Sequence, residues 1–121
     1  MAETNFSQID VDTGMATSTA GAATINVQTG IITTEALATA AGATYTMTLT
    51  NAAITANSIV LVTVGKGTAT TGEPVVQFVT PAAGSCVILI RNVSAAAALN
   101  GTIKIGFLVM NGASVASTYS S

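Results

Sequence analysis

The last apolar run of the chain, residues 103–110, alternates in a way that few folds accommodate. Large apolar residues fall on one side of an extended chain (Ile103, Ile105, Phe107 and Val109), and Lys104, Gly106, Leu108 and Met110 fall on the other. A period of two predicts a β-strand with one face on a hydrophobic core. Two similar runs rich in Val, Ile and Phe precede it at 73–80 and 85–92, separated by turn residues at 81–84 and 100–101. We therefore expect residues 73–111 to form a β-meander.

Further strand patterns lie upstream. Residues 44–50 alternate four threonines with Tyr45, Met47 and Leu49, and residues 22–27 alternate in the same way. Residues 57–66 are almost continuously apolar, which predicts a strand buried on both faces. The alanine-rich segments 35–43 and 94–101 are too short for stable isolated helices and are expected to be loops. Seven or eight strands between residues 22 and 111 predict an all-β fold, a single antiparallel β-sandwich of jelly-roll-like form. An immunoglobulin-like sandwich is the alternative, although the chain has no Trp.

The length of 121 residues predicts one domain with three parts. Residues 1–21 have scattered apolar side chains without a period and are expected to form an N-terminal arm. Residues 22–111 form the sandwich, and 112–121 a polar C-terminal tail. Candidates for contact with the same subunit or a neighbour are Phe6, Ile9, Val11 and Met15 in the arm.

Charged residues make up 7% of the chain, against about 25% in an ordinary domain. A surface with so few charges is poorly protected against association. It is covered either by copies of the chain or by another partner, or else it is a neutral face rich in threonine. From Thr13 onward three basic residues face two acidic ones, which is too little positive charge to neutralise a phosphate backbone, so no nucleic-acid partner is expected. The N-terminus has no signal-peptide pattern and no run approaches a membrane span, so we expect synthesis in the cytoplasm and no membrane partner.

Catalytic and metal-binding patterns are not found in the sequence. With no His and one Cys, neither Cys–His catalysis nor a zinc cluster can be assembled, and the lone thiol of Cys86, alternating with Ile88 and Ile90, is expected to be buried. We therefore predict no enzyme activity, no cofactor and no metal. Arg91 shares a face with Val87 and Leu89. It either pairs with a carboxylate across a subunit contact or extends to solvent at the strand end.

The segment PAAGSCVILIRNVSAAAALNGTIKIGFLVMN, residues 81–111, resembles small β-sandwich proteins of tailed bacteriophages. The preceding ITANSIVLVTVGKGTATTGEPVV fits the same pattern, and the resemblance spans roughly residues 42–111. It is similar to head decoration, or cement, proteins and also to domains of phage fibres.

The resemblance to decoration proteins implies a structural virion protein without an active site. Such a protein forms a homotrimer on the capsid surface, contacts the major capsid protein and stabilises contacts between capsomers. The alternative is a fibre or receptor-binding module that recognises a host surface through loops 38–42, 66–72 and 93–101. These loops consist mostly of Ala, Thr and Gly, and they lack the aromatic and Arg residues that commonly anchor interfaces.

Overall fold

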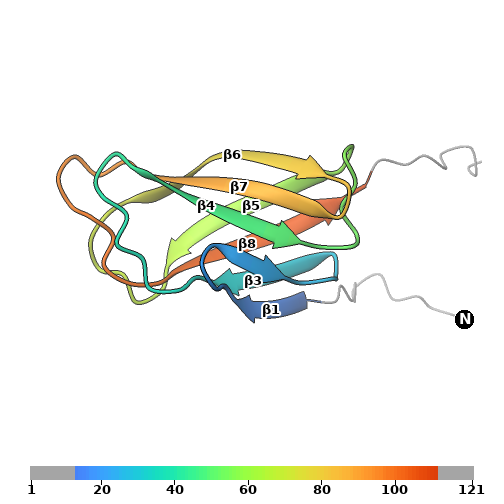
Figure 1. Cartoon of the computed structure of the whole chain (residues 1–121), viewed down its shortest axis with the longest axis horizontal. Helices are drawn as coiled ribbons and strands as arrows, with labels where there is room; N and C mark the ends of the chain where they lie inside the picture. The colour runs from blue at the N-terminus through green and yellow to red at the C-terminus, as the bar shows by residue number, and fades with distance from the viewer. Residues whose placement is uncertain (1–12, 112–121) are drawn as a thin grey trace, which may run out of the picture.

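The computed structural model describes residues 13–111, which form eight strands and no helix (Figure 1). The strands are β1 (Thr13–Thr17), β2 (Ala22–Thr24), β3 (Thr29–Thr33), β4 (Thr44–Thr50), β5 (Ile59–Lys66), β6 (Pro74–Ala82), β7 (Ser85–Asn92) and β8 (Ile103–Met110). Sheet A has the order β1-β3-β8-β5, and sheet B the order β2-β4-β7-β6. The all-β class and the predicted strand number are therefore confirmed.

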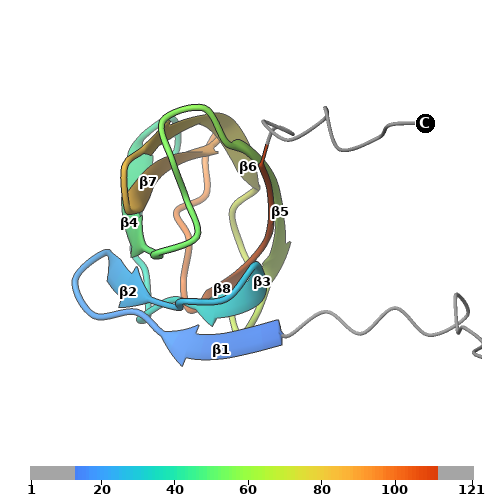
Figure 2. The same ribbon diagram turned by 90° about the vertical axis from the view of Figure 1, so that its right-hand side faces the viewer.

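The hydrophobic core lies between the two sheets (Figure 2). Sheet A contributes Ile32 and the predicted apolar side of β8, and sheet B contributes Met47, Leu49, Cys86, Ile88 and Ile90, all at most 4% exposed. Apolar side chains from connections fill the space beyond the strands, among them Leu37, Ile54 and Leu99. The alternation read in the sequence therefore identifies the inner face of β8 correctly, and Cys86 is buried as expected.

The expected meander is wrong in its last step. Strands β6 and β7 form a hairpin in sheet B, but β8 crosses to sheet A and lies between β3 and β5. Both edges of β7 are already paired, one with β4 and the other with β6. The inner side of β8 is fully apolar. It is buried because β8 lies in sheet A and faces sheet B, instead of joining sheet B as a further strand.

The sandwich is also not purely antiparallel, and the expected arm is too long. β1 pairs with β3, and β2 with β4, in parallel. Residues 13–17 were expected in the arm but form β1, and a tight turn at Ala20 and Gly21 then leads into β2. The pattern at 13–17 did not predict a strand, because its one large apolar residue, Met15, points outward and is 75% exposed. Residues 1–12, with Phe6, Ile9 and Val11, and the tail 112–121 lie outside the described residues.

Strand β5 departs from the expectation that both of its faces are buried. Val60, Val62 and Val64 are half-buried against the core, whereas Ile59 and Leu61 are 58% and 52% exposed. β5 is an edge strand of sheet A, and nothing in the described chain covers its outer side. A continuous apolar run therefore predicts a strand with two apolar faces, but it does not predict that residues of the same chain cover both of them.

Candidate interaction surface

The outer face of sheet A exposes a group of large apolar side chains. We call this surface the sheet A face; its large exposed side chains are Met15, Ile31, Ile59, Leu61, Leu108 and Met110. Strand register makes them neighbours, since Met15 pairs with Ile31, Leu61 with Leu108, and Ile59 with Met110. With an average exposure near one half and about 200 Å² for a fully exposed large side chain, they present roughly 600 Å² of apolar surface, the upper end for a typical monomer.

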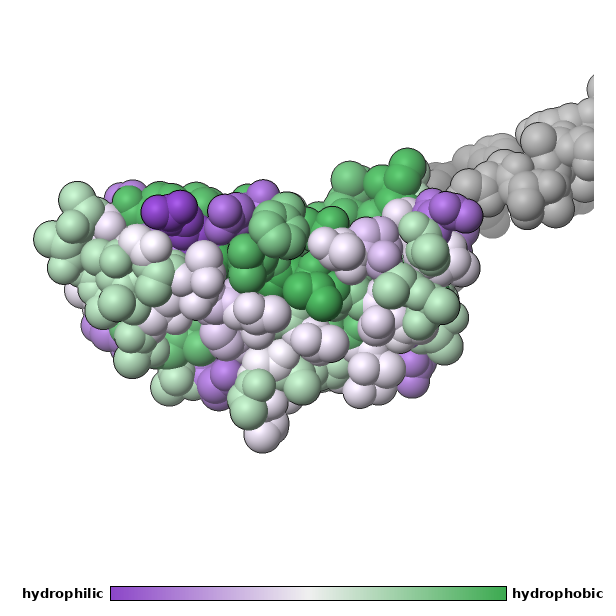
Figure 3. Space-filling view, turned by 45° about the horizontal axis from the view of Figure 1, so that its top comes forward, coloured by the Kyte–Doolittle hydropathy of each residue, from purple (hydrophilic) through white to green (hydrophobic). Residues whose placement is uncertain are grey.

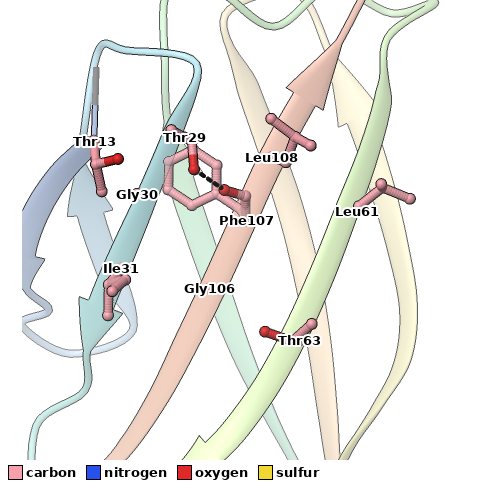
Figure 4. Close-up of a pocket in the computed structure, with 9 residues that line it drawn as sticks. All are labelled: Thr13, Thr29, Gly30, Ile31, Leu61, Thr63, Gly106, Phe107 and Leu108. Atoms are coloured by element: carbon pink, nitrogen blue, oxygen red, sulfur yellow. Dashed lines mark hydrogen bonds between the residues drawn. The ribbon is translucent and has the colours of Figure 1, made fainter. Parts of the chain in front are cut away.

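A groove crosses the sheet A face over the middle of β8 (Figure 4). Gly106 lies at its centre, paired with Ile31 on one side and Thr63 on the other, and Leu61 and Leu108 continue the wall. The recess has a volume of about 390 Å³. The groove exists because Gly106 has no side chain at a position where its neighbours on the same strand, Lys104 and Leu108, have long ones.

The layer beneath the groove is tightly built. The Phe107 ring lies on the core side of sheet A, where a Cβ on Gly30 would come within 2.8 Å of it, so only Gly fits at this position of β3. The Thr29 hydroxyl donates a hydrogen bond of 2.9 Å to the Phe107 carbonyl (Figure 4). These contacts hold β3 and β8 in register, so the groove is a fixed feature of the sheet.

The outer face of sheet B has two zones. The threonines at 44, 46, 48 and 50 are exposed in a row along β4, as the alternation predicted. Beside them is an apolar strip on β6 and β7, and Figure 3 shows green surface here with near-neutral residues on one side and hydrophilic residues on the other. Its most exposed members are Val75 and Phe78, at 39% and 51%. The outer face of sheet B therefore presents a neutral threonine row and, beside it, an exposed apolar strip.

A β-bulge controls the direction of Phe78. The pairing of β6 with β7 shifts between Val76, opposite Ile90, and Phe78, opposite Leu89. With strict alternation Phe78 would share the inner side with Val76. The extra residue, Gln77, reverses the alternation and turns the Phe78 ring to the outer face, which is the local effect that a bulge has on a strand.

The three loops proposed for recognition meet at one end of the sandwich, and Asn92 organises them. This side chain is fully buried at the end of β7. Its amide nitrogen donates to the carbonyls of Thr39, Ala40 and Ala97 at 3.1, 3.3 and 2.9 Å, and its oxygen accepts from the backbone amides of Glu73 and Ser94 at 2.9 and 3.1 Å. One asparagine thus connects loops from three different parts of the chain.

Asn100 makes a similar but exposed set of contacts at the same end. Its oxygen accepts from the amides of Thr70 and Thr71 at 2.6 and 3.0 Å, and its nitrogen donates to the Thr70 hydroxyl at 2.8 Å. Thr71 in turn donates to the Ala98 carbonyl at 2.6 Å. The loops are therefore held together by hydrogen bonds, at the end of the sandwich away from Thr13 and Asn111 (Figure 1).

A second polar cluster connects the β1–β2 turn to the rest of the sandwich. The Glu35 carboxylate accepts hydrogen bonds from the Ser18 hydroxyl, from the Tyr45 hydroxyl at 3.1 Å and from the Gly21 amide at 3.0 Å. Burial alone would raise the pKa of Glu35, but these hydrogen bonds together outweigh it and lower the pKa below its ordinary value. Burial, with the adjacent Glu35 charge, raises the pKa of Tyr45 to about 12. Ser18 is buried, so this cluster serves as a structural contact rather than as an accessible reactive site.

The residues predicted for contact are not brought together. Met15 belongs to the sheet A face, whereas Arg91 lies on the outer side of sheet B, opposite Thr44 and Val75. Val87 and Leu89 face outward together with Arg91, and the Arg91 side chain is exposed. Its exposed position at the end of strand β7 favours extension to solvent.

Sequence reasoning missed the features that define the surface. The groove depends on Gly106 at an outward position in a central strand, which was visible in the sequence but not interpreted. The exposure of Phe78 depends on a bulge, for which the sequence offered no signal. Asn92 and Asn100 fall within the quoted phage-like segment, but their loop-connecting roles appear only in three dimensions.

No helix within residues 13–111 is long and apolar enough to cross a bilayer. In this same part of the chain, no group of three His, Cys, Asp or Glu side chains is placed to hold a metal ion.

Comparisons of the chain with protein-family models, with curated proteins and with solved structures gave no match.

Proposed function

We propose that the chain is a structural virion protein, a head decoration or cement protein that forms homotrimers on a phage capsid and stabilises contacts between capsomers. The observation that carries this proposal is the sheet A face, with six large apolar side chains exposed on a chain of only eight charged residues. Such a surface favours association over a monomeric state in solution. The resemblance of residues 42–111 to phage decoration proteins points to the same role.

A jelly-roll-like arrangement is part of the proposal. Strands β3 to β8 give the orders β3-β8-β5 and β4-β7-β6, so in each sheet a late strand lies between two early ones. The connections β3–β4, β4–β5, β5–β6 and β7–β8 all pass from one sheet to the other. This wrapping of the chain around the core is typical of double-sheet Greek-key folds, and β1 and β2 add a parallel strand at one edge of each sheet.

Capsid attachment would combine many weak contacts. A standard protein interface buries about 1,600 Å² in total, and repetition over a symmetric shell raises the overall affinity without any single strong contact. We assign the shell contact to the N-terminal segment with Phe6, Ile9 and Val11. Deleting residues 2–12 tests this assignment and leaves β1 intact; unchanged capsid binding by the deletion variant would refute it.

The test of the function is omission of the protein from the phage that encodes it. Particles that assemble without it but lose DNA or break at lower temperature than complete particles support the cement role. Restoration of their stability by the purified protein would establish that the effect is direct. Particles of unchanged stability without the protein would contradict the proposal.

A fibre or receptor-binding module is the second candidate, and one observation favours it. Loops 38–42, 66–72 and 93–101 are joined by Asn92 and Asn100 at the end away from both described chain ends, as expected of an exposed tip. In the omission experiment this function predicts intact, stable particles that fail to adsorb to the host.

A further inference from the structure

We propose that the groove of the sheet A face receives Phe78 from a second copy of this chain, so that subunits join head to tail into a closed ring. This inference rests on the proposed role as an oligomeric structural protein and specifies the contact. The groove and Phe78 are two parts of one interface that no single chain can complete.

The groove has the form of a site for a bulky apolar group. Its centre is Gly106, in the interior of the central strand β8, where Gly weakens a strand and often marks a close approach by another group. Ile31, Leu61 and Leu108 provide apolar walls. A cavity of roughly 150 Å³ is enough to hold a benzene molecule, so a recess of 390 Å³ has room for a phenyl ring and its neighbours.

Phe78 has the form of the complementary group. It is the one aromatic residue among the large exposed side chains of residues 13–111, and it is 51% exposed. The bulge at Gln77 turns it outward, although regular alternation would bury it beside Val76. Bulky aromatic side chains in apolar pockets are typical anchors of protein interfaces.

Phe78 and the groove cannot meet within one chain. Phe78 lies on the outer face of sheet B and the groove on the outer face of sheet A, so they face in different directions. The two surfaces approach each other where β5 and β6, the edge strands of the two sheets, follow one another around one side of the sandwich (Figure 2). An interface between two different surfaces is heterologous, and it forms a ring if the rotation between successive copies closes and an open filament if it does not.

The two surfaces are mainly apolar and differ in size. In this contact the large exposed apolar residues present roughly 600 Å² on the sheet A face of one copy and roughly 200 Å² at Val75 and Phe78 of the other. Their total of roughly 800 Å² is half of a standard interface, so neighbouring side chains of both faces must contribute the rest. The only charged residues in the strands of sheet A are Lys66 and Lys104, which lie at the loop end of β5 and β8, away from the Leu61–Leu108 pair. Lys104 borders the groove beside Gly106, and its long side chain can cover an inserted ring with its methylene groups while the ammonium group stays in water.

The test uses two variants of the full chain that each remove one half of the contact. Phe78→Thr removes the ring and keeps a residue suited to a strand surface. Gly106→Val fills the groove, and its Cβ meets only the Thr63 hydroxyl, at 3.0 Å, which can rotate away. Thr46→Val on the opposite zone of sheet B is the matched control. Circular dichroism melting verifies folding, and Leu61→Lys replaces Gly106→Val if that variant does not fold.

The readout is the mass in solution by light scattering. We expect the wild type and Thr46→Val to be oligomeric and each of the two contact variants to fall to the monomer mass of 11.9 kDa. A mixture of the two variants should form dimers, because the Phe78 of one can still enter the intact groove of the other. A monomeric wild type, a contact variant that keeps the wild-type mass, or a mixture that stays monomeric well above the wild-type assembly concentration would each overturn the inference.

The capsid experiment separates this inference from the proposed function. Loss of assembly in the variants, together with no effect of the protein on particle stability, would support the contact and refute the cement role. Stabilised particles, together with variants that keep the wild-type mass, would do the reverse.

Discussion

Replacing Asn92 with Ala should destabilise the fold strongly, and replacing Asn100 with Ala should not. Both asparagines connect loops at the same end of the sandwich, and both make several side-chain hydrogen bonds. They differ in burial, since Asn92 is fully buried and Asn100 is exposed. Comparing the two variants therefore isolates the effect of burial on how much a side-chain hydrogen bond contributes to stability.

The expected loss of stability follows from the backbone groups that lose their hydrogen-bond partner in each variant. Asn92→Ala leaves the amides of Glu73 and Ser94 and the carbonyl of Ala97 without the fully buried side chain that is their partner. Each buried group left unsatisfied costs about 1–3 kcal/mol, and partial relaxation of the loops should leave a total near 3 kcal/mol. Water can replace the exposed partners of Asn100, so its loss should cost less than about 1 kcal/mol.

The assay is urea unfolding followed by far-ultraviolet circular dichroism, because the chain has no Trp for fluorescence. With a slope of about 1.5 kcal/mol per M, Asn92→Ala should lower the midpoint by about 2 M and Asn100→Ala by less than about 0.7 M. All measurements use one protein concentration, since association shifts apparent stability. Equal midpoints for the two variants would refute the reasoning that burial decides the cost.

Three further outcomes are expected. The pKa of Glu35 is lowered in the folded protein, so the stabilising effect of its carboxylate is complete above the ordinary pKa of 4.5 and is lost as the pH falls below that value. The urea midpoint of Glu35→Gln should therefore fall less on acidification than that of the wild type. Parallel pH profiles of the two midpoints would contradict this. Cys86 is fully buried and burial raises the pKa of its thiol, so it should resist a thiol reagent in the native protein and react rapidly in urea, whereas fast native reaction would show that the core opens easily. Ile88→Ala, at the centre of the core, should cost about 3 kcal/mol in urea unfolding and the exposed Thr48→Ala less than about 1 kcal/mol, and similar costs would place Ile88 outside the core.

The parts of the fold that follow from local pattern were predictable. The inner face of β8, the threonine row of β4 and the buried Cys86 all depend on period-two alternation, which the sequence displays directly. Which strands pair with each other depends on the whole sandwich. The crossing of β8 to sheet A and the parallel pairing of β1 with β3 therefore could not be predicted from the alternation within each strand.

The interaction surface was harder to predict, for a physical reason. An apolar residue in a strand has the same sequence signature whether its own chain or another subunit covers it, so the run containing Ile59 and Leu61 was assigned to the interior. Phe78 was hidden by the bulge at Gln77, which reverses the alternation within one strand. The signals that remained were the low charge of the chain and Gly106 at an outward position between large residues.

The proposed trimer requires that copies of the chain cover the sheet A face, and the mass of the purified protein in solution tests this most directly. Light scattering should give a mass near three times 11.9 kDa, stable on dilution into the micromolar range. A mass of 11.9 kDa at every concentration would mean that the apolar face remains in contact with water, and would contradict the proposed trimer.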